Sequence, residues 1–396
     1  MPLSVWLDPV PAPRPALSGD VACDVVVIGA GVTGAAAARH LARAGVEVVW
    51  LESSRVAMRA TGRNAGFILQ GTAERYDRAR TMMGADRARR VHAWSLDNHD
   101  RMAAVIADEG IACHYRRGGS LQLAGSAQEE AELVESARLL RADGFEAELL
   151  TGDAVPAVHR AAGFGVGVRL PRDGELDPAA FVRGAADAAT RAGARLFEDS
   201  PVTALHADAP GDVRAVTPGG VVSAQVALVC TNARAGQLLP WFADKVDPVR
   251  GQMLATAPAP PLFDQPIYAD HGYDYWRQDH LGRVVLGGWR NLDPDAEVGH
   301  EETLNEGIQA RMTAFLRRYP GMADVPVTHR WAGIMGFSRD GLPLVGPAPS
   351  APGAVVAAGF TGHGFGFAWL SGEAAATVVL DGSHPLVDDL GPRRFA

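Results

Sequence analysis

Three glycines near the N-terminus have the spacing of a phosphate-binding turn. Gly29, Gly31 and Gly34 form a G-x-G-x-x-G pattern. A β-branched run at residues 24–28 precedes them, and an Ala-rich segment of helical character follows at residues 35–44. In such a unit the first glycine permits the tight turn, the second lets the backbone approach a pyrophosphate, and the third lets helix and strand pack closely. The pattern predicts a dinucleotide site with its phosphates at a helix N-terminus.

An acidic residue follows the next predicted strand. That strand covers residues 46–51, and Glu52 comes directly after it. A carboxylate at this position can accept hydrogen bonds from the ribose hydroxyls of adenosine. A G-x-G-x-x-G turn alone can be only a turn, whereas the full order of strand, glycines, helix, strand and acid favours dinucleotide binding.

A second glycine-rich turn lies close to the C-terminus. Residues 359–366 read GFTGHGFG, after a predicted strand at 354–358 and before a predicted helix that runs to Leu380. Two strand-turn-helix units at opposite ends of the chain indicate that both ends build one cofactor site. The middle of the chain would then cover that site.

The elements between these two ends are predicted from periodicity and from start and stop signals. Residues 1–20 are Pro-rich and are expected to lie extended on the surface. Asp177 and Pro178 are typical of an N-cap and a first helical position. The remaining elements are helical stretches in 84–143 around a strand at 115–123, a helix from Pro178 to about Gly193, strands at 194–205, 221–230 and within 246–285, and a helix at 301–319.

The composition limits the classes of protein to which the chain can belong. The chain has 396 residues, 47% of them hydrophobic, which is enough for a large core in two or three domains. A net charge of −9 argues against a nucleic-acid partner. The apolar stretch at 354–370 is cut by glycines, so we expect no transmembrane segment, and no signal peptide is indicated.

Cysteine and histidine spacing gives no sign of a disulfide framework or a metal site. Cys23, Cys113 and Cys230 are odd in number and far apart. The histidines show no HxH or HExxH spacing. We therefore expect no metal and a cytoplasmic location.

The chain resembles the superfamily of FAD-dependent amine and amino-acid oxidases that includes D-amino-acid, glycine and sarcosine oxidases. Within it, the Pro-rich lead-in and the loop TGRNAGF are similar to those of γ-glutamylputrescine oxidase-like amine oxidases. The motifs that carry the resemblance occur in the expected order at residues 17–20, 24–34, 61–67, 230–233, 333–346 and 359–366.

The resemblance implies an α/β (α+β) two-domain fold, in which a Rossmann-like FAD-binding domain is interleaved with an antiparallel-sheet substrate domain. The FAD domain would take residues 21–85, 150–235 and 325–390, and the substrate domain 86–149 and 236–324. FAD contacts are expected at Gly29, Gly31, Val32, Thr33, Gly34, Glu52, Ser53, Arg59, Thr61, Arg63, Asn64, Gly66, Phe67, Val202, Thr231, Asn232, Gly333, Gly362, His363, Gly364, Phe365, Gly366 and Phe367.

The activity that the resemblance implies is oxidation of the C–N bond of a small amine. A hydride would pass from the carbon beside a neutral nitrogen to flavin N5, with O2 or another acceptor reoxidising the flavin. Aromatic side chains can line such a pocket and hold a partly cationic amine by cation–π contact, although each of them can instead simply pack within a sheet. The residues expected around the reacting atoms are His363, Tyr273, Tyr275, Trp289 and Met335.

Several positions depart from the family pattern. Met335 and Gly366 stand where related enzymes carry a carboxylate-binding arginine and lysine, and Leu286 stands where sarcosine oxidases carry a lysine that assists oxygen. No cysteine lies near Gly333 to bond covalently to flavin. We therefore expect noncovalent FAD and a substrate without an α-carboxylate, unless Arg63, Arg277 or Arg290 reaches the pocket from another wall. The sequence context of Arg277 and Arg290 is more typical of solvated surface than of substrate ligands.

Three alternatives remain open from the sequence. One is an amino-acid oxidase or dehydrogenase of the D-amino-acid, glycine or sarcosine type. Another is an NAD(P)-dependent dehydrogenase, which shares the N-terminal unit but does not require the turn at 359–366. The third is a flavoprotein subunit without turnover of its own.

Overall fold

Strand β2 lies inside a six-stranded sheet because its four residues are apolar on both faces. The computed structural model describes residues 2–396. Val25 and Val27 pack into the core below the helices, whereas Val26 and Ile28 pack into a second core on the other face. All strand pairs in this sheet are parallel except β19–β20. Its order is β19 (Leu344–Pro347), β20 (Ala354–Ala358), β13 (Val226–Val229), β2 (Val25–Ile28), β3 (Val48–Leu51) and β9 (Arg195–Phe197).

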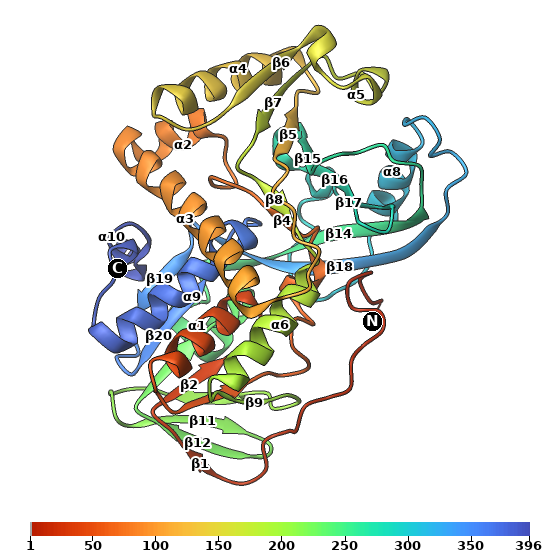
Figure 1. Ribbon diagram of the computed structural model, residues 1–396. Helices are drawn as coiled ribbons and strands as arrows, with labels where there is room; N and C mark the ends of the chain where they lie inside the picture. Colours follow the sequence, from red (N-terminus) through yellow and green to blue (C-terminus); the bar gives the residue numbers. More distant parts are fainter. Residues whose placement is uncertain (1) are drawn as a thin grey trace.

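Three helices cover one face of this sheet (Figure 1). Helices α1 (Val32–Arg43) and α9 (Gly364–Asp381) pack together so closely that a Cβ atom at Gly372 would lie 2.3 Å from the Thr33 carbonyl oxygen. The third helix, α6 (Pro178–Arg191), begins at the predicted N-cap, where the Asp177 carboxylate accepts hydrogen bonds from two backbone N–H groups. The close contact of α1 with α9 brings the two chain ends to one place.

A second, eight-stranded sheet stands beside the first. Its strands pair antiparallel except for the parallel pair β15–β5. Helix α8 (Glu306–Leu316) packs on it around the fully buried Trp276. The order is β18 (Val327–Ser338), β14 (Val246–Pro258), β17 (Arg283–Gly288), β16 (Asp274–Gln278), β15 (Ile267–Ala269), β5 (Ser120–Leu123), β7 (Val166–Leu170) and β6 (Glu148–Thr151).

The remaining elements are smaller or peripheral, apart from the long helix α3 (Ala85–Glu109), which packs against α9. One sheet joins β1 (Val21–Ala22), β12 (Gly220–Ala224), β11 (Val213–Thr217) and β10 (Ala204–His206), and another joins β4 (Phe67–Ile68) to β8 (Gly174–Glu175). The other helices are α2 (Tyr76–Met83), α4 (Ala127–Ala142), α5 (Ala157–Ala161), α7 (Ala235–Leu238), α10 (Leu386–Leu390), and the short 3-10 turns η1 (Ala60–Arg63), η2 (Gly152–Ala154), η3 (Asn232–Arg234), η4 (Pro240–Phe242), η5 (Asp270–Gly272), η6 (Arg290–Leu292) and η7 (Pro392–Phe395).

The N-terminal lead-in differs from its prediction. Met1 lies outside the described residues, and residues 4–7 are buried rather than spread on the surface. The Trp6 indole N–H donates to the Asn64 carbonyl oxygen at 2.7 Å, and the Ser4 hydroxyl donates to the Gly62 carbonyl oxygen. The apolar side chains within the Pro-rich run therefore anchor the lead-in beneath η1.

Two boundaries also differ from the sequence-based expectation. The strand predicted at 194–205 is two strands, β9 and β10, and Val202 lies in the loop between them. The helix predicted at 301–319 is shorter and begins after Asn305, whose side chain accepts a hydrogen bond from the Ile308 N–H.

The domain division stays a proposal. Strands β6, β7 and β18 belong to the eight-stranded sheet, although the predicted boundaries put residues 150–170 and 327–338 in the FAD domain. A division that follows the sheets would move both segments to the substrate domain.

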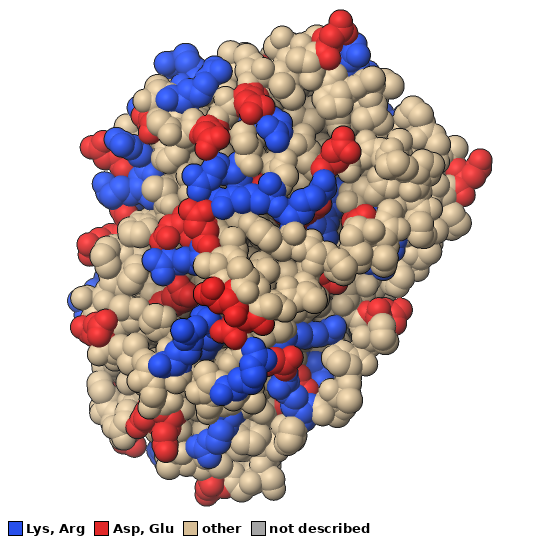
Figure 2. All heavy atoms as spheres, in the orientation of Figure 1, with Lys and Arg blue, Asp and Glu red and all other residues tan. Residues whose placement is uncertain are grey.

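The surface carries mixed charge. Figure 2 shows basic and acidic side chains interspersed over one face, and ion pairs such as Arg172–Asp100 at 2.9 Å join some of them. None of the helices formed by residues 2–396 has the length and apolar character needed to span a bilayer.

Candidate cofactor and substrate site

A cavity of about 200 Å³ lies where α1, α9 and the eight-stranded sheet meet. Both glycine-rich turns and the loop around η1 open into it, as expected. The predicted site residues that line it are Gly31, Val32, Thr33, Thr61, Arg63, Asn64, Phe67, Asn232, Tyr273, Tyr275, Gly333, Met335, Gly362, His363, Gly364, Phe365 and Gly366.

The N-terminus of α1 is suited to a phosphate group. The N-cap residue Gly31 has no side chain to accept from the first turn, so the N–H groups that follow that of Val32 are open to an anion. The Val32 N–H donates to Thr61 Oγ1 at 3.2 Å, and a Cβ atom at Gly31 would lie only 2.8 Å from the same oxygen. Gly29 has a φ of +102°, which favours glycine. These features fit the close approach of a pyrophosphate.

Glu52 is placed behind the turn rather than on the cavity wall. Its carboxylate accepts hydrogen bonds from the Ala30 N–H at 2.8 Å, the Ser54 N–H at 2.9 Å and the Ser53 hydroxyl at 3.0 Å. Burial raises the pKa of Glu52, and these three hydrogen bonds oppose that rise. One acceptor position on Oε2 remains for a ribose hydroxyl, so this contact stays a prediction.

The loop from Arg59 to Phe67 is fixed by its own side chains. The Asn64 amide donates to the carbonyl oxygens of Ala60 and Thr61, and its Oδ1 accepts from the Gly66 N–H at 2.7 Å. The buried Arg63 guanidinium donates to the Ala332 carbonyl oxygen at 3.0 Å, which ties the loop to β18. These hydrogen bonds favour a backbone cradle for a ligand over a solvated connection.

The turn before α9 brings an uncapped helix N-terminus to the opposite wall. A Cβ atom at Gly366 would lie 2.6 Å from the Leu69 carbonyl oxygen, so no longer side chain fits there without moving the backbone that follows β4. His363 is partly buried, and its surroundings lower its pKa to about 4 by desolvation. Its imidazole is therefore neutral near pH 7.

Aromatic rings form the wall on the side of the eight-stranded sheet. Tyr268 and Tyr275 stack with ring centroids 5.6 Å apart, and Phe67 packs edge-on against both. Burial raises the pKa of Tyr275 to about 12, so both hydroxyls stay protonated at neutral pH. Tyr268 was not among the predicted site residues, although the aromatic density of its segment was the available signal.

Arg290 also lines this cavity, whereas its sequence context indicated solvated surface. Its guanidinium lies 4.5 Å from the ring centroid of Tyr273 and 4.8 Å from that of Phe337. No carboxylate among residues 2–396 forms an ion pair with it in the structure. Arg277, expected to be exposed, is instead buried behind the loop, where it donates to the Leu176 carbonyl oxygen at 2.8 Å.

Some predicted site residues do not line the cavity. Trp289 differs most from expectation, because its ring packs against Phe315 with centroids 4.9 Å apart inside the core of the second sheet. Arg59 pairs with Glu302 at 3.5 Å outside the cavity. The others are Gly29, Gly34, Glu52, Ser53, Gly66, Val202, Thr231 and Phe367.

Some of the lining residues that were not predicted lay inside motifs recognised in the sequence and could have been named, namely Cys230, Ile334, Phe337, Phe360 and Thr361. Others belong to the eight-stranded sheet or to the turn after β15, and only tertiary contacts bring them here; they include Gly251, Met253, His271, Gly272 and Gly288. Within residues 2–396, no group of His, Cys, Asp and Glu side chains is arranged to hold a metal ion.

Sequence comparison identifies the class of protein that this fold and site define. Residues 24–378 match the model of the FAD dependent oxidoreductase family (DAO), and the chain belongs to that family. Its cofactor is accordingly FAD, and it is an oxidoreductase.

Individual relatives and one solved structure show which members of the family are similar to this chain. The chain is 29% identical over 365 residues to glycine oxidase of Bacillus licheniformis, covering 90% of this chain and 93% of that protein. It is 27% identical over 381 residues to γ-glutamylputrescine oxidoreductase of Escherichia coli, covering 93% and 86%. The solved structure of glycine oxidase from Geobacillus kaustophilus shares the fold, with a TM-score of 0.80, 21% identity and coverage of 94% and 98%.

Proposed function

We propose that this protein oxidises the C–N bond of an amine that binds in its neutral form. The observation that carries the proposal is the cavity wall, which has no Asp or Glu side chain among the described residues that line it. A bound ammonium ion would lose its hydration there without gaining an anionic partner, which is costly. A neutral amine avoids that cost and keeps the lone pair that oxidation requires.

The residues of the chain supply positioning and exclusion of water. Bound FAD would accept a hydride from the carbon beside the nitrogen. The rings of Tyr268 and Tyr275 keep water from that carbon, and neutral His363 can accept a hydrogen bond from the amine N–H without adding charge. The uncapped N-terminus of α9 would stabilise negative charge that develops on the cofactor.

A second candidate, oxidation of an amino acid, is favoured by one observation. Met335 and Gly366 leave two family positions without a cation, but the Arg290 guanidinium stands on the same cavity wall without an ion-pair partner among the described residues. Guanidinium groups bind carboxylates in bidentate fashion. The two relatives named above, a glycine oxidase and a γ-glutamylputrescine oxidoreductase, correspond to these two candidates.

A matched substrate pair tests the choice. We would compare kcat/KM for an amino acid of either configuration with that for its decarboxylated amine, using an artificial electron acceptor. The amine should be better by about ten- to hundredfold, because a carboxylate without a charged partner forfeits roughly 1.5–3 kcal/mol. Preference for the amino acid that disappears in Arg290→Leu would instead establish the second candidate. Failure of every amine and amino acid to bleach the flavin anaerobically would exclude both.

The proposal also covers the electron acceptor and the cellular location. O2 or another electron acceptor would take up the electrons that FAD receives from the amine. Leu286 is fully buried in the second sheet and supplies no cation that could assist O2. The three cysteines are free and buried, which supports a cytoplasmic location. The partner is a small molecule rather than a nucleic acid.

A further inference from the structure

A second cavity, of about 70 Å³, adjoins the first beneath α2 and α4. The two cavities share the residues Leu69, Ala73, Tyr268, His271, Gly272 and His363. The rings of Tyr268 and His363, with centroids 6.2 Å apart, therefore stand between the cofactor cavity and this outer cavity. A substrate longer than a simple amine would extend past them.

Two buried side chains of the outer cavity have polar atoms without partners. Gln70 is 6% exposed, and neither its Oε1 nor its Nε2 has a hydrogen-bond partner among the described residues. His92 is 4% exposed, and its Nε2 likewise has none. Leaving a buried polar group unpaired costs about 1–3 kcal/mol, so such groups ordinarily meet water or a ligand. Together they offer an amide donor, an amide acceptor and an imidazole nitrogen to one small space.

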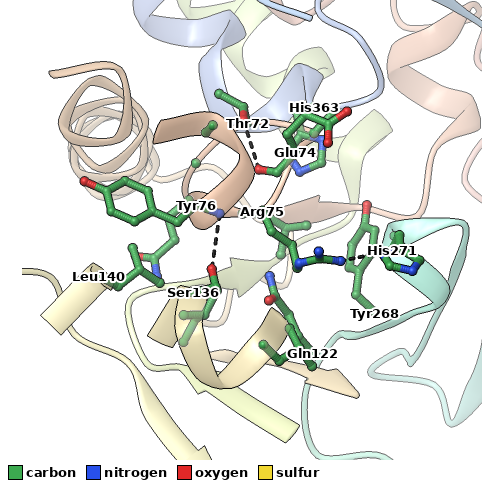
Figure 3. Close-up of a pocket in the computed structure, with 18 of the residues that line it drawn as sticks. Thr72, Glu74, Arg75, Tyr76, Gln122, Ser136, Leu140, Tyr268, His271 and His363 are labelled. Atoms are coloured by element: carbon green, nitrogen blue, oxygen red, sulfur yellow. Dashed lines mark hydrogen bonds between the residues drawn. The ribbon is translucent and has the colours of Figure 1, made fainter. Parts of the chain in front are cut away.

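The charged side chains of the outer cavity already have ion-pair or hydrogen-bond partners. Arg75 pairs with Glu132 at 2.6 Å and contacts His271, toward which its guanidinium points (Figure 3). The Glu129 carboxylate accepts hydrogen bonds from the Gly125 N–H at 2.7 Å and the His271 N–H at 2.8 Å. Burial lowers the pKa of His92 to about 3, which keeps its ring uncharged. The charged groups of this space are therefore already engaged, whereas the two polar atoms of Gln70 are not.

We propose that the outer cavity is a subsite for the distal end of the substrate, and that it binds a neutral hydrogen-bonding group such as a primary carboxamide through Gln70. This inference rests on the proposed function for the reacting end of the substrate. A carboxamide presents one acceptor and two donors, which match the two unpartnered atoms of Gln70. The apolar lining from α2 and α4, including Leu133 and Leu140, would hold the adjoining methylene groups.

The test compares ω-amino amides, from 3-aminopropanamide to 6-aminohexanamide, with alkylamines, ω-amino acids and diamines of equal length. We expect one amide to exceed all three analogues by about tenfold in kcat/KM, and Gln70→Leu to reduce that ratio to about threefold or less. The matched control is Gln237→Leu, an exposed glutamine on α7, which should keep the wild-type ratio. An equal ratio in wild type and Gln70→Leu, or a carboxylate or ammonium end that serves as well as the amide, would overturn the proposal.

A binding measurement separates the subsite from the reaction. Hexanamide has no oxidisable amine, so its calorimetric titration into the holoenzyme reports the subsite alone. Saturable binding in wild type that is lost in Gln70→Leu supports the subsite even if every amine fails to reduce the flavin, in which case only the proposed function fails. Ala73→Phe, at a shared loop position, checks the result independently of Gln70, because it should block the passage and abolish the preference for long amides. Wild-type affinity for hexanamide in Gln70→Leu would mean that Gln70 meets only ordered water.

Discussion

Glu52 shows how one carboxylate can serve both the fold and the cofactor. We expect Glu52→Ala to raise the dissociation constant of FAD by about ten- to hundredfold, since a charge-assisted hydrogen bond is worth roughly 1.5–3 kcal/mol. The choice of amine should not change. FAD titration of the apoprotein measures this, with Ser54→Ala as the control, because only the backbone N–H of Ser54 contacts the carboxylate.

The same substitution also removes the acceptor of the Ala30 and Ser54 N–H groups. The thermal stability of the apoprotein should therefore fall in Glu52→Ala. If stability falls while FAD content and affinity stay at wild-type values, Glu52 is only a strand-end residue that holds the turn.

The buried carboxyl group of Asp173 should make the stability of the folded protein fall as the pH rises. Burial raises the pKa of Asp173 to about 7, despite hydrogen bonds from Ser120 and the Gln70 N–H. The unfolded carboxyl ionises near pH 4, so between these values the folded protein holds a proton that the unfolded chain has lost. The contribution of this group to stability is complete below about pH 4 and is lost as the pH rises through 7.

The corresponding measurement uses Asp173→Asn in excess FAD. The unfolding free energy of wild type minus that of the variant should fall by on the order of 2–3 kcal/mol between pH 5 and pH 8. Other titrating groups largely cancel in this difference. A difference that does not change with pH would show that Asp173 ionises normally in the folded protein.

Residues within a sequence motif could be assigned to the site from the sequence, whereas the surroundings of isolated arginines could not. Met335 and Gly366 were placed by local sequence, and both line the cavity. Arg277 and Arg290 carry no local signal, because their surroundings come from residues far away in the sequence. Arg277 donates to the Gly66 and Leu176 carbonyl oxygens, and Arg290 lies over the ring of Phe337. Trp289 was misplaced for the same reason.

At the scale of elements, the N-terminus of α1 makes a prediction of its own. Gly31→Ala would bring a methyl group within 2.8 Å of Thr61 Oγ1, on the side that a phosphate must approach. We expect FAD affinity to fall at least about tenfold while the apoprotein still folds. The double variant with Thr61→Ala should relieve the contact in the apoprotein without restoring affinity. Recovery of FAD binding in the double variant would mean that the methyl group itself is tolerated.

Elements with strong local signals matched the structure, and those decided by tertiary contacts did not. The strands at 24–28, 46–51 and 354–358 and the helix after Asp177 carry their own signals, namely continuous apolar runs and an N-cap. The lead-in was assigned to the surface from its prolines. Its burial depends on Trp6 and Ser4 finding carbonyl groups of η1 and the loop after it, which no local pattern reveals.

At the scale of the whole molecule, FAD should be held without a covalent bond. Cys230 is the cysteine on the cavity wall, and burial raises its pKa, so it stays a thiol and is a poor nucleophile. Acid precipitation should therefore release all of the flavin into the supernatant. Yellow colour that remains in the washed, denatured pellet would contradict this expectation.

The strand order of the six-stranded sheet leaves one edge of strand β2 without its partner during much of the synthesis of the chain. Strand β2 leaves the ribosome early, but its neighbour β13 follows only after more than half of the chain, and β20 comes near the end. Until β13 emerges, the apolar strand Val25–Ile28 has one unpaired edge of the kind that promotes aggregation. Nascent chains stalled before residue 226 should therefore bind chaperones that recognise extended apolar segments, and binding should weaken once residues 226–229 have emerged and can pair with β2.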